Sequence, residues 1–397
     1  EDHGGRAPGG EVRLVRHGRH ARHRRPLSAG ARAWLTAFAS TASVLLAATL
    51  TLAMTAGAES VGSAAAPAAT PTSSTVPAAD PPCPLSGLRP PGGKVPQHPA
   101  LAVKVDNYPE ARPQSGLDKA DVVFEEPVEG GITRLVAVFQ CQSASLVGPI
   151  RSAREVDSQI LDELSRPVFV HVGGITPVLS IIADADDFDE NVSANGSTVQ
   201  NPSGRYPPYD TYISTAAGWG LQPTDATPPA PIFTYSPTAP AGSPVTSLHI
   251  PYSQTNDVTW TWSSDSGSWL LAYSGEPATV ANGGQIAVPN IVVQTVHVSY
   301  GPWAENESGA LEVESQLTGS GPLAVFRNGV EVKGTWQRSS MGSPTRLVAS
   351  DGSVIALEPG ETWIEIVPSA IPVTTTGPSS VAGSNASGPG SSGPLSP

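Results

Sequence analysis

Stretches rich in proline and glycine limit how this chain of 397 residues can fold. The 41 Pro and 40 Gly make up about a fifth of the chain, and three stretches contain few large apolar side chains. Such segments cannot bury enough surface to fold on their own. We therefore expect a disordered tether at residues 59–82, a Pro-rich linker at 222–244 and a disordered tail at 369–397. Two blocks of ordinary domain size remain, 83–221 and 245–368.

An uncharged run before the first block predicts where the protein resides. Residues 33–58 carry no charged side chain and are long enough to cross a bilayer, which takes about 20 residues. Residues 1–32 form a basic leader with eight Arg and three acidic residues, which predicts that the leader stays in the cytoplasm and the rest lies outside. Residues 56–58, Ala-Gly-Ala, have the form of a cleavage site, so residues 33–58 are either a signal peptide or a transmembrane anchor. If it is uncleaved, this run attaches the protein to the membrane of the cell envelope.

The charge of the chain excludes one class of partner. The net charge is −13 although the leader is basic, so the remainder is strongly acidic. An acidic surface repels a phosphate backbone, and we therefore expect no binding to nucleic acid. Cell-wall glycan, cell-wall peptide and envelope proteins remain as possible partners.

The first block mixes strands and helices. Short runs rich in β-branched residues predict strands at residues 101–105, 121–124, 134–139 and 168–172. Apolar residues at helical spacing predict a helix over residues 152–164, and a second helix is expected at 177–182. Residues 83–221 are therefore expected to form a mixed α/β domain.

The second block has the pattern of an antiparallel β domain. Strands are predicted at residues 259–262, 268–273, 291–298 and 362–367. Asn328-Gly329 between two apolar runs is a strong hairpin signal, because both turn residues must tolerate a positive φ. The expected fold class is α+β, with the mixed α/β domain followed by a mostly antiparallel β domain.

Seven short motifs in one order identify a family. The first block carries these motifs: Pro84-Leu85-Ser86-Gly87-Leu88, Val105-Asp106-Asn107, Ala111-Arg112-Pro113-Gln114-Ser115-Gly116-Leu117, Ala120-Asp121, Glu129-Gly130-Gly131-Ile132-Thr133-Arg134, Gly148-Pro149-Ile150-Arg151-Ser152-Ala153-Arg154 and His171-Val172-Gly173-Gly174. With Asn290-Ile291-Val292-Val293-Gln294 and Pro359-Gly360-Glu361-Thr362-Trp363-Ile364 in the second block, residues 83–368 resemble the YerB-like family of bacterial cell-envelope lipoproteins. The resemblance implies a two-domain extracytoplasmic protein whose activity is not established.

The chain departs from that family at three places. Family members carry a lipobox cysteine at the membrane, and no Cys stands at the end of residues 33–58 here. Tyr209-Asp210-Thr211-Tyr212 replaces a His-Asn-x-Tyr segment, and Pro277-Ala278 replaces a Pro-His pair. Any chemistry or metal binding by those two histidines is therefore expected to be lost.

A candidate anion site lies at the start of the first predicted helix. Arg151, Ser152 and Arg154 fall on its first turn, where free backbone N–H groups and the helix dipole favour an anion. Arg134 is a further candidate for this site, and guanidinium groups suit bidentate recognition of carboxylate or phosphate. The alternative is that these arginines pair with native carboxylates such as Glu129 and hold the domain together.

A second set of candidates is a polar cluster at predicted strand ends. Its members are Asp106, Asn107, Glu125, Glu129 and His171. Carboxylates within reach of a histidine could perform acid–base work. The alternative is turn capping by Asp and Asn together with a buried, hydrogen-bonded histidine. No metal-site, nucleotide-binding or common hydrolase motif occurs, so we expect neither a metal nor a cofactor.

Two functions are compatible with these features. The first is a non-catalytic extracytoplasmic protein, tethered or secreted, that binds a cell-wall component or a partner protein. The alternative is an extracytoplasmic hydrolase of cell-wall glycan or peptide that uses Asp106, Glu125 or Glu129 with His171. The hydrolase and the anion site both require Asp106, Glu125, Arg151, Arg154 and His171 to converge in one cleft, and both hypotheses fail if these residues scatter.

The two cysteines predict a disulfide. Export places Cys83 and Cys141 in an oxidising compartment, where two thiols of one domain tend to be joined. Such a bridge would join the end of the tether to the first block. It requires Cα atoms within about 7 Å.

Overall fold

The computed structural model describes residues 81–378 except 195 and 197. The expectations for the leader, for residues 33–58 and for most of the tether lie outside these residues. Within the described part of the chain, no helix is long and apolar enough to cross a membrane.

The first block contains five strands and three α-helices among its described residues. The strands are β1 (Leu101–Asp106), β2 (Val122–Pro127), β3 (Thr133–Phe139), β4 (Val168–His171) and β5 (Phe188–Asn191), and the helices are α1 (Glu155–Asp162), α2 (Thr176–Asp184) and α3 (Thr215–Trp219). The four predicted strands and both predicted helices are present. A short turn, η4 (Glu129–Gly131), connects β2 to β3.

Helix α1 begins three residues later than the sequence predicted. Residues 151–154 stay extended because their backbone bonds to strands on both sides. The N–H of Arg151 donates to the carbonyl of Lys104 (2.9 Å) on β1, and the N–H of Ala153 donates to the carbonyl of Gly173 (3.0 Å) after β4. Arg151 and Ser152 therefore precede the helix, and Arg154 is its N-cap.

The second block is made of strands. They are β6 (Ser243–Pro244), β7 (Ser247–Pro251), β8 (Asp257–Ser263), β9 (Ser268–Tyr273), β10 (Glu276–Pro277), β11 (Ala287–Val288), β12 (Asn290–Val296), β13 (Val298–Ala304), β14 (Leu311–Ser315), β15 (Gly319–Arg327), β16 (Val330–Arg338), β17 (Arg346–Ala349), β18 (Thr362–Pro368) and β19 (Thr374–Thr376). The predicted hairpin at Asn328-Gly329 is confirmed, since both residues have positive φ and connect β15 to β16.

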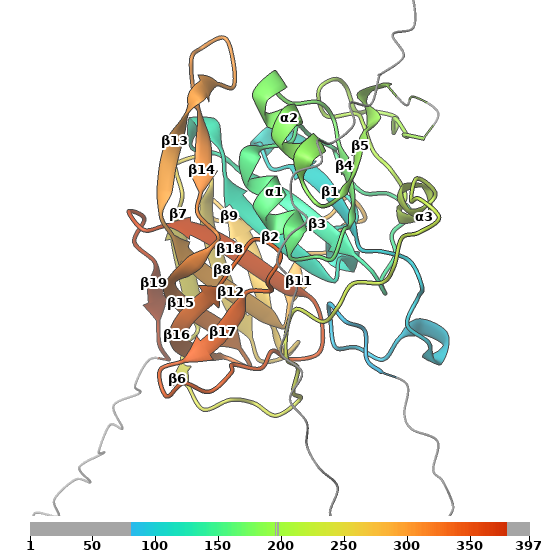
Figure 1. Ribbon diagram of the computed structural model, residues 1–397. Coiled ribbons are helices and arrows are strands. Elements are labelled where there is room, and N and C mark those ends of the chain that lie inside the picture. The colour runs from blue at the N-terminus through green and yellow to red at the C-terminus, as the bar shows by residue number, and fades with distance from the viewer. Residues whose placement is uncertain (1–80, 195, 197, 379–397) are drawn as a thin grey trace, which may run out of the picture. The chain divides into compact units, whose positions relative to one another are not determined.

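The two blocks contribute strands to one shared β-sheet. Its strand order is β17-β16-β15-β12-β18-β2-β3-β1-β4-β5, and the junction is the parallel pair β18–β2, with Thr362 opposite Val122. Figure 1 shows red β18 beside β2 at the centre of the molecule. A second sheet, in the order β10-β9-β8-β7-β19, belongs to the second block and the segment after it. The expected α+β class is thus corrected to a more β-rich fold.

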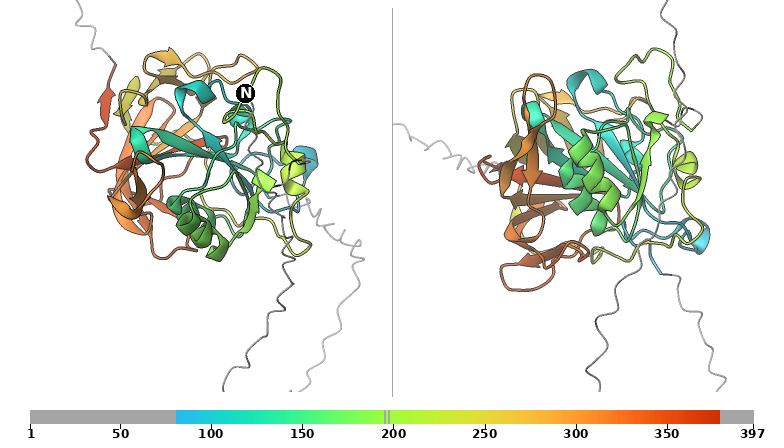
Figure 2. Two further views of the ribbon diagram at one scale, coloured as in Figure 1. Left: turned by 90° about the horizontal axis from the view of Figure 1, so that it is seen from above. Right: turned by 45° about the horizontal axis from the view of Figure 1, so that its top comes forward.

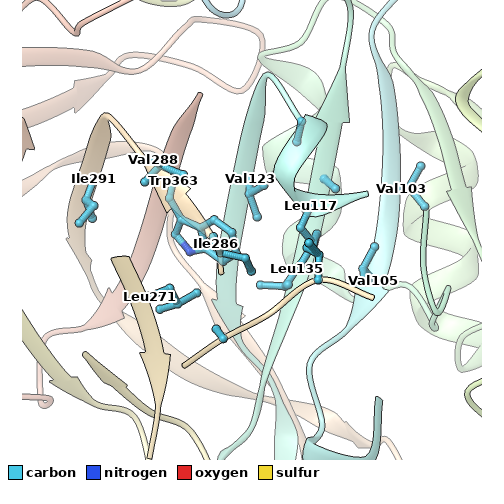
Figure 3. Close-up of a cluster of buried hydrophobic side chains, with 14 of the residues drawn as sticks. Val103, Val105, Leu117, Val123, Leu135, Leu271, Ile286, Val288, Ile291 and Trp363 are labelled. Atoms are coloured by element: carbon cyan, nitrogen blue, oxygen red, sulfur yellow. The ribbon is translucent and has the colours of Figure 1, made fainter. Parts of the chain in front are cut away.

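The shared sheet is buried on both faces around the junction. On one face Val123, Leu135 and Trp363 pack against the second sheet, as Figure 3 shows. On the other face Phe124 and Val136 pack against α1 and α2, which lie next to each other in both views of Figure 2. Because side chains alternate along a strand, each residue of β1 to β3 is committed to one of these two faces.

The expected linker and the first residues of the expected tail are partly built into the fold. The structure corrects the linker at 222–244: Ile232 is buried, and the Leu357 N–H donates to the carbonyl of Thr234 (2.8 Å). The apolar Ile232 and Tyr235 explain this, because they find space against the core. Residues 369–378 of the expected disordered tail are corrected in the same way, since β19 pairs with β7, and the expectation for 379–397 lies outside the described residues.

Candidate functional site

A charged pocket of about 510 Å³ opens at the carboxyl ends of the parallel strands β1 and β4. It is lined by Asp106, Tyr108, Glu129, Ile132, Arg134, Arg151, Ser152, Arg154, Gly174, Ile175, Tyr209, Glu305 and Asn306. The last two residues come from the β13–β14 hairpin, so both blocks build this pocket. Ligand pockets in α/β sheets occur at strand ends of this kind.

Strand register brings the central residues of the pocket together. Asp106 at the end of β1 lies opposite Arg134 near the start of β3, and alternation points both side chains toward the face that carries α1. Glu129 stands in the η4 turn, where Gly130 and Gly131 both have positive φ and allow a tight reversal. The sequence EGGITR (residues 129–134) thus places the carboxylate of Glu129 and the guanidinium of Arg134 at one edge of the sheet.

Arg154 is held by carboxylates of both blocks. Its Nε donates to Glu129 Oε2 (2.8 Å), its Nη2 bonds to the other oxygen of Glu129, and its Nη2 lies 3.2 Å from Glu305 Oε2. Burial alone would raise the pKa of Glu129, but the hydrogen bonds from Arg154 and the neighbouring guanidinium charges lower it to about 2. Arg154 therefore pairs with the native carboxylate of Glu129, which was the alternative to its role in an anion site.

Arg151 differs from Arg154 because it remains open to solvent. Its side chain is 29% exposed, and its Nε lies 2.9 Å from Asp106 Oδ2. The guanidinium lies over the ring of Tyr209, 5.8 Å from the ring centre. Among residues 81–378, no hydrogen bond uses its two terminal nitrogens. Arg151 can therefore bind a ligand without first losing its ion pair.

The pocket also contains buried polar atoms without a partner in the described part of the chain. Arg134 is 5% exposed, donates from Nη1 to the carbonyl of Ser152 (3.2 Å), and has no partner at Nε. Burial lowers the pKa of Arg134 to about 10, which leaves it charged at neutral pH. Glu305 is buried as well, and its carboxylate hydrogen-bonds to Glu312. The donors that stay open to the pocket are those of Arg151, which suit a ligand that carries a carboxylate.

The N-terminus of α1 is occupied by the protein's own side chains, which corrects the expected anion site at that position. The N–H of Arg154 donates to Asp157 Oδ2 (2.7 Å), and the N–H of Glu155 donates to Glu312 Oε1 (2.8 Å). Burial, together with the hydrogen bond to Glu305, raises the pKa of Glu312 to about 9, so this carboxyl group is neutral at pH 7. The candidate site that remains is the pocket beside Arg151 and Ser152.

The predicted polar cluster divides into three places. Asp106 and Glu129 lie in the pocket, whereas Asn107 and Glu125 lie in the core on the other face of the sheet. Glu125 is fully buried and accepts hydrogen bonds from Asn107 Nδ2 (3.1 Å), Thr133 Oγ1 (2.7 Å), Tyr273 OH (2.9 Å) and Trp363 Nε1 (3.1 Å). The acid–base arrangement expected for a hydrolase is therefore not assembled from these residues.

His171 occupies the third place, as a buried residue with two partners. Its Nδ1 lies 2.8 Å from the carbonyl of Gly173, and its Nε2 lies 2.7 Å from Asp189 Oδ1. The side chain has no exposed surface and does not line the pocket. This arrangement matches the buried, hydrogen-bonded alternative.

Sequence reasoning missed a buried charged group behind the pocket. Nζ of Lys104 bonds to Glu126 and to Asp157 Oδ1 (2.6 Å), and all three side chains have no exposed surface. Burial and the nearby Asp157 charge raise the pKa of Glu126 to about 7, although Lys104 opposes this shift. The available signal was a lysine in the middle of the apolar strand Leu101–Asp106.

The expected disulfide is confirmed. Cys83 and Cys141 are bonded, with their Cα atoms 6.0 Å apart. These are the two cysteines of the chain, so neither offers a free thiol. Within the described residues, no group of three or more potential ligands could hold a metal ion.

Comparisons with known proteins match both blocks. Residues 85–224 match the N-terminal domain, and residues 248–364 the C-terminal domain, of a protein of unknown function, DUF3048. A Bacillus subtilis (strain 168) protein provisionally named lipoprotein YerB is 31% identical over 300 residues, which is 72% of this chain and 86% of that protein. The crystal structure of YerB protein from Bacillus subtilis is similar with a TM-score of 0.63 and 26% identity, covering 74% of this chain and 99% of that one.

Two matched blocks that share one sheet and one pocket define a two-domain protein of the DUF3048 class. The chain belongs to this family, and among its members it is similar to YerB over most of its length.

Proposed function

We propose that this protein is a non-catalytic binding protein on the outer side of the cytoplasmic membrane and that its charged pocket binds a peptide component of the cell wall. The similarity to a protein named as a lipoprotein supports an envelope location. The disulfide between Cys83 and Cys141 supports an oxidising compartment. Residues 33–58 then serve as a membrane anchor or as an export signal.

The chemistry of the pocket carries the choice of ligand. Three guanidinium groups stand against the carboxylates of Asp106, Glu129 and Glu305, so the pocket is nearly balanced in charge. A simple anion would gain little from such a lining. A peptide with a free carboxylate can use the open nitrogens of Arg151 while the rest of its chain contacts the pocket lining.

The hydrolase alternative has no observation in its favour. It requires Asp106, Glu125 or Glu129 to act with His171, and His171 is fully buried, bonded to Asp189 and absent from the lining of the pocket that contains Asp106. The carboxylate of Glu129 is held by Arg154 and kept ionised, which makes it a poor proton donor. We therefore develop the binding function alone.

Binding to purified bacterial cell wall tests this proposal. We expect the full chain to sediment with the wall, and trialanine, a small peptide with both free termini, to compete. Arg151→Ala should weaken binding about tenfold, since one charge-assisted hydrogen-bonded contact is lost. Arg346→Ala removes an exposed arginine from β17 and serves as the charge-matched control. Equal binding by the two variants would contradict the proposal.

A further inference from the structure

A second cavity of about 510 Å³ lies next to the charged pocket and has a different lining. It is formed by Pro127, Val128, Glu129, Gly130, Gly131, Ile132, Tyr252, Val298, Tyr300, Ala310, Leu311, Val313, Pro368, Ala370 and Ile371. Glu129 is the one charged side chain in this lining, and both of its oxygens are bonded to Arg154. The cavity is therefore an apolar groove without a free charge.

The β13–β14 hairpin separates charged from apolar side chains. It projects from the body of the protein beside α1 (Figure 1). Glu312 points toward the start of α1, where it accepts from the N–H of Glu155. The neighbouring residues Leu311 and Val313 line the groove, as expected from the alternation of side chains along a strand. One hairpin thus contributes to both cavities.

The apolar face of this hairpin is not covered by the rest of the described chain. Tyr300 is 71% exposed and Leu311 is 44% exposed. Large apolar side chains exposed together beside a groove are typical of a binding surface. Isolated exposed residues would need no such explanation.

The groove and the charged pocket are neighbours. They share Glu129 and Ile132 in their linings. At Gly130, in the turn that carries Glu129, an added methyl group would meet no other atom within 4 Å. The backbone of this turn therefore leaves space for a ligand that contacts both cavities.

We propose that the groove is a second subsite of the same binding site and that the ligand is a peptide with apolar side chains next to its charged terminus. This inference rests on the proposed function, because it assigns the terminus to the pocket beside Arg151. Because the groove shares Glu129 and Ile132 with the pocket that takes the terminus, its occupant is the continuation of the same peptide chain. The combined site then selects peptides by length as well as by charge.

Peptides of two lengths test the subsite. Affinities of the full chain are measured for trialanine and for two pentapeptides that carry a pair of leucines at one end or the other. We expect one pentapeptide to bind about tenfold more tightly than trialanine, since burial of a leucine contributes at least that much. Two pentapeptides that bind no better than trialanine would overturn the inference.

Substitutions in the groove test whether the gain in pentapeptide affinity arises there. Leu311→Lys and Tyr300→Lys should each remove most of the tenfold gain while leaving trialanine binding unchanged. Val354→Lys is the control, because Val354 is similarly exposed (48%) and lines neither cavity. Arg151→Ala should weaken trialanine and pentapeptide equally. Failure of the proposed function has a different signature, namely no effect of Arg151→Ala on either peptide.

Two other occupants give separate results. If vesicles of phosphatidylcholine displace the pentapeptide, the occupant of the groove is a lipid and the inference is wrong. If the full chain sediments as a dimer and Tyr300→Lys dissociates it, the occupant is a second copy of this chain and the inference is also wrong. The inference is supported if the full chain sediments as a monomer and the vesicles do not displace the pentapeptide.

Discussion

Two polar clusters lie on opposite faces of the shared sheet and differ in how completely they are bonded. The cluster in the core surrounds Glu125, which accepts four hydrogen bonds and has no exposed surface. The cluster in the pocket surrounds Arg151, which is partly exposed and has two open nitrogens. Polar groups that are fully bonded stabilise a fold, whereas open ones in a cavity are available to a ligand.

The core cluster also joins the two blocks. Glu125 on β2 lies opposite Glu365 on β18, at the junction of the shared sheet. Glu365 accepts from Nε1 of Trp260 (2.7 Å) on β8 and from the hydroxyl of Tyr252 (3.1 Å), which follows β7. Burial raises the pKa of Glu365 well above its ordinary value. The sequence motifs around Glu125 and Glu365 are therefore explained by assembly of the fold.

The largest expected effect is loss of stability when the core cluster is broken. Glu125→Leu leaves four buried donors without an acceptor, and we expect the free energy of unfolding to fall by about 5 kcal/mol. Arg151→Ala should lower it by less than about 1 kcal/mol, because that ion pair is partly exposed. Denaturant unfolding of both variants measures the difference. Equal losses would remove the distinction between the two clusters.

Removal of the disulfide should separate stability from binding. In the chain-entropy model, a loop of 58 residues contributes about 4 kcal/mol, so the variant with Cys83→Ser and Cys141→Ser should lose about that much. Neither cysteine lines the pocket. We expect trialanine to bind the folded variant with unchanged affinity. A tenfold loss of affinity at a temperature where the variant is folded would show that the pocket depends on this bridge.

The sequence predicted the elements better than their assembly. Strands such as Leu101–Asp106 are recognisable because their apolar character is local. The pairing of β2 with β18 joins residues about 240 positions apart, and no local pattern encodes such a contact. β5 was not predicted because Asp189 and Glu190 give it an acidic composition, and only its pairing with β4 makes it a strand.

The candidate site was predicted in part for the same reason. Arg134, Arg151 and Asp106 could be selected because they stand at the ends of predicted strands or before a predicted helix. Glu125 and Asp106 look alike in the sequence, but side-chain alternation sends them to opposite faces of the sheet. Glu305 and Asn306 could not be found, because the hairpin that carries them comes from the other block.

Within the pocket cluster, Glu312 should control part of the pH dependence of stability. Its pKa is about 9 in the folded chain and near 4.5 when unfolded, so its contribution to stability is present below pH 4.5 and is lost as the pH rises toward 9. Glu312→Gln is neutral throughout. Relative to the unchanged chain, we expect it to gain on the order of 1 kcal/mol between pH 5 and pH 9.

Glu129 should affect the pH dependence of stability in the opposite direction to Glu312. Its pKa is lowered to about 2, so its contribution to stability is present above pH 4.5 and is lost as the pH falls toward 2. Glu129→Gln should therefore lose stability at pH 7 and little at pH 2. Denaturant unfolding at pH 2, 5, 7 and 9 measures both variants. Parallel pH profiles for Glu312→Gln and Glu129→Gln would contradict the assigned protonation states.

The smallest expected effect concerns the aromatic ring beside Arg151. Tyr209 lies within cation–π distance of that guanidinium, at 5.8 Å, and such contacts contribute about 0.5–1 kcal/mol at partly exposed sites. Tyr209→Leu should weaken trialanine binding two- to fivefold and change the free energy of unfolding by less than about 0.5 kcal/mol. Tyr209→Phe keeps the ring and should bind as the unchanged chain does. If Phe and Leu weaken binding equally, the hydroxyl group of Tyr209 contacts the ligand, and the ring does not act through Arg151.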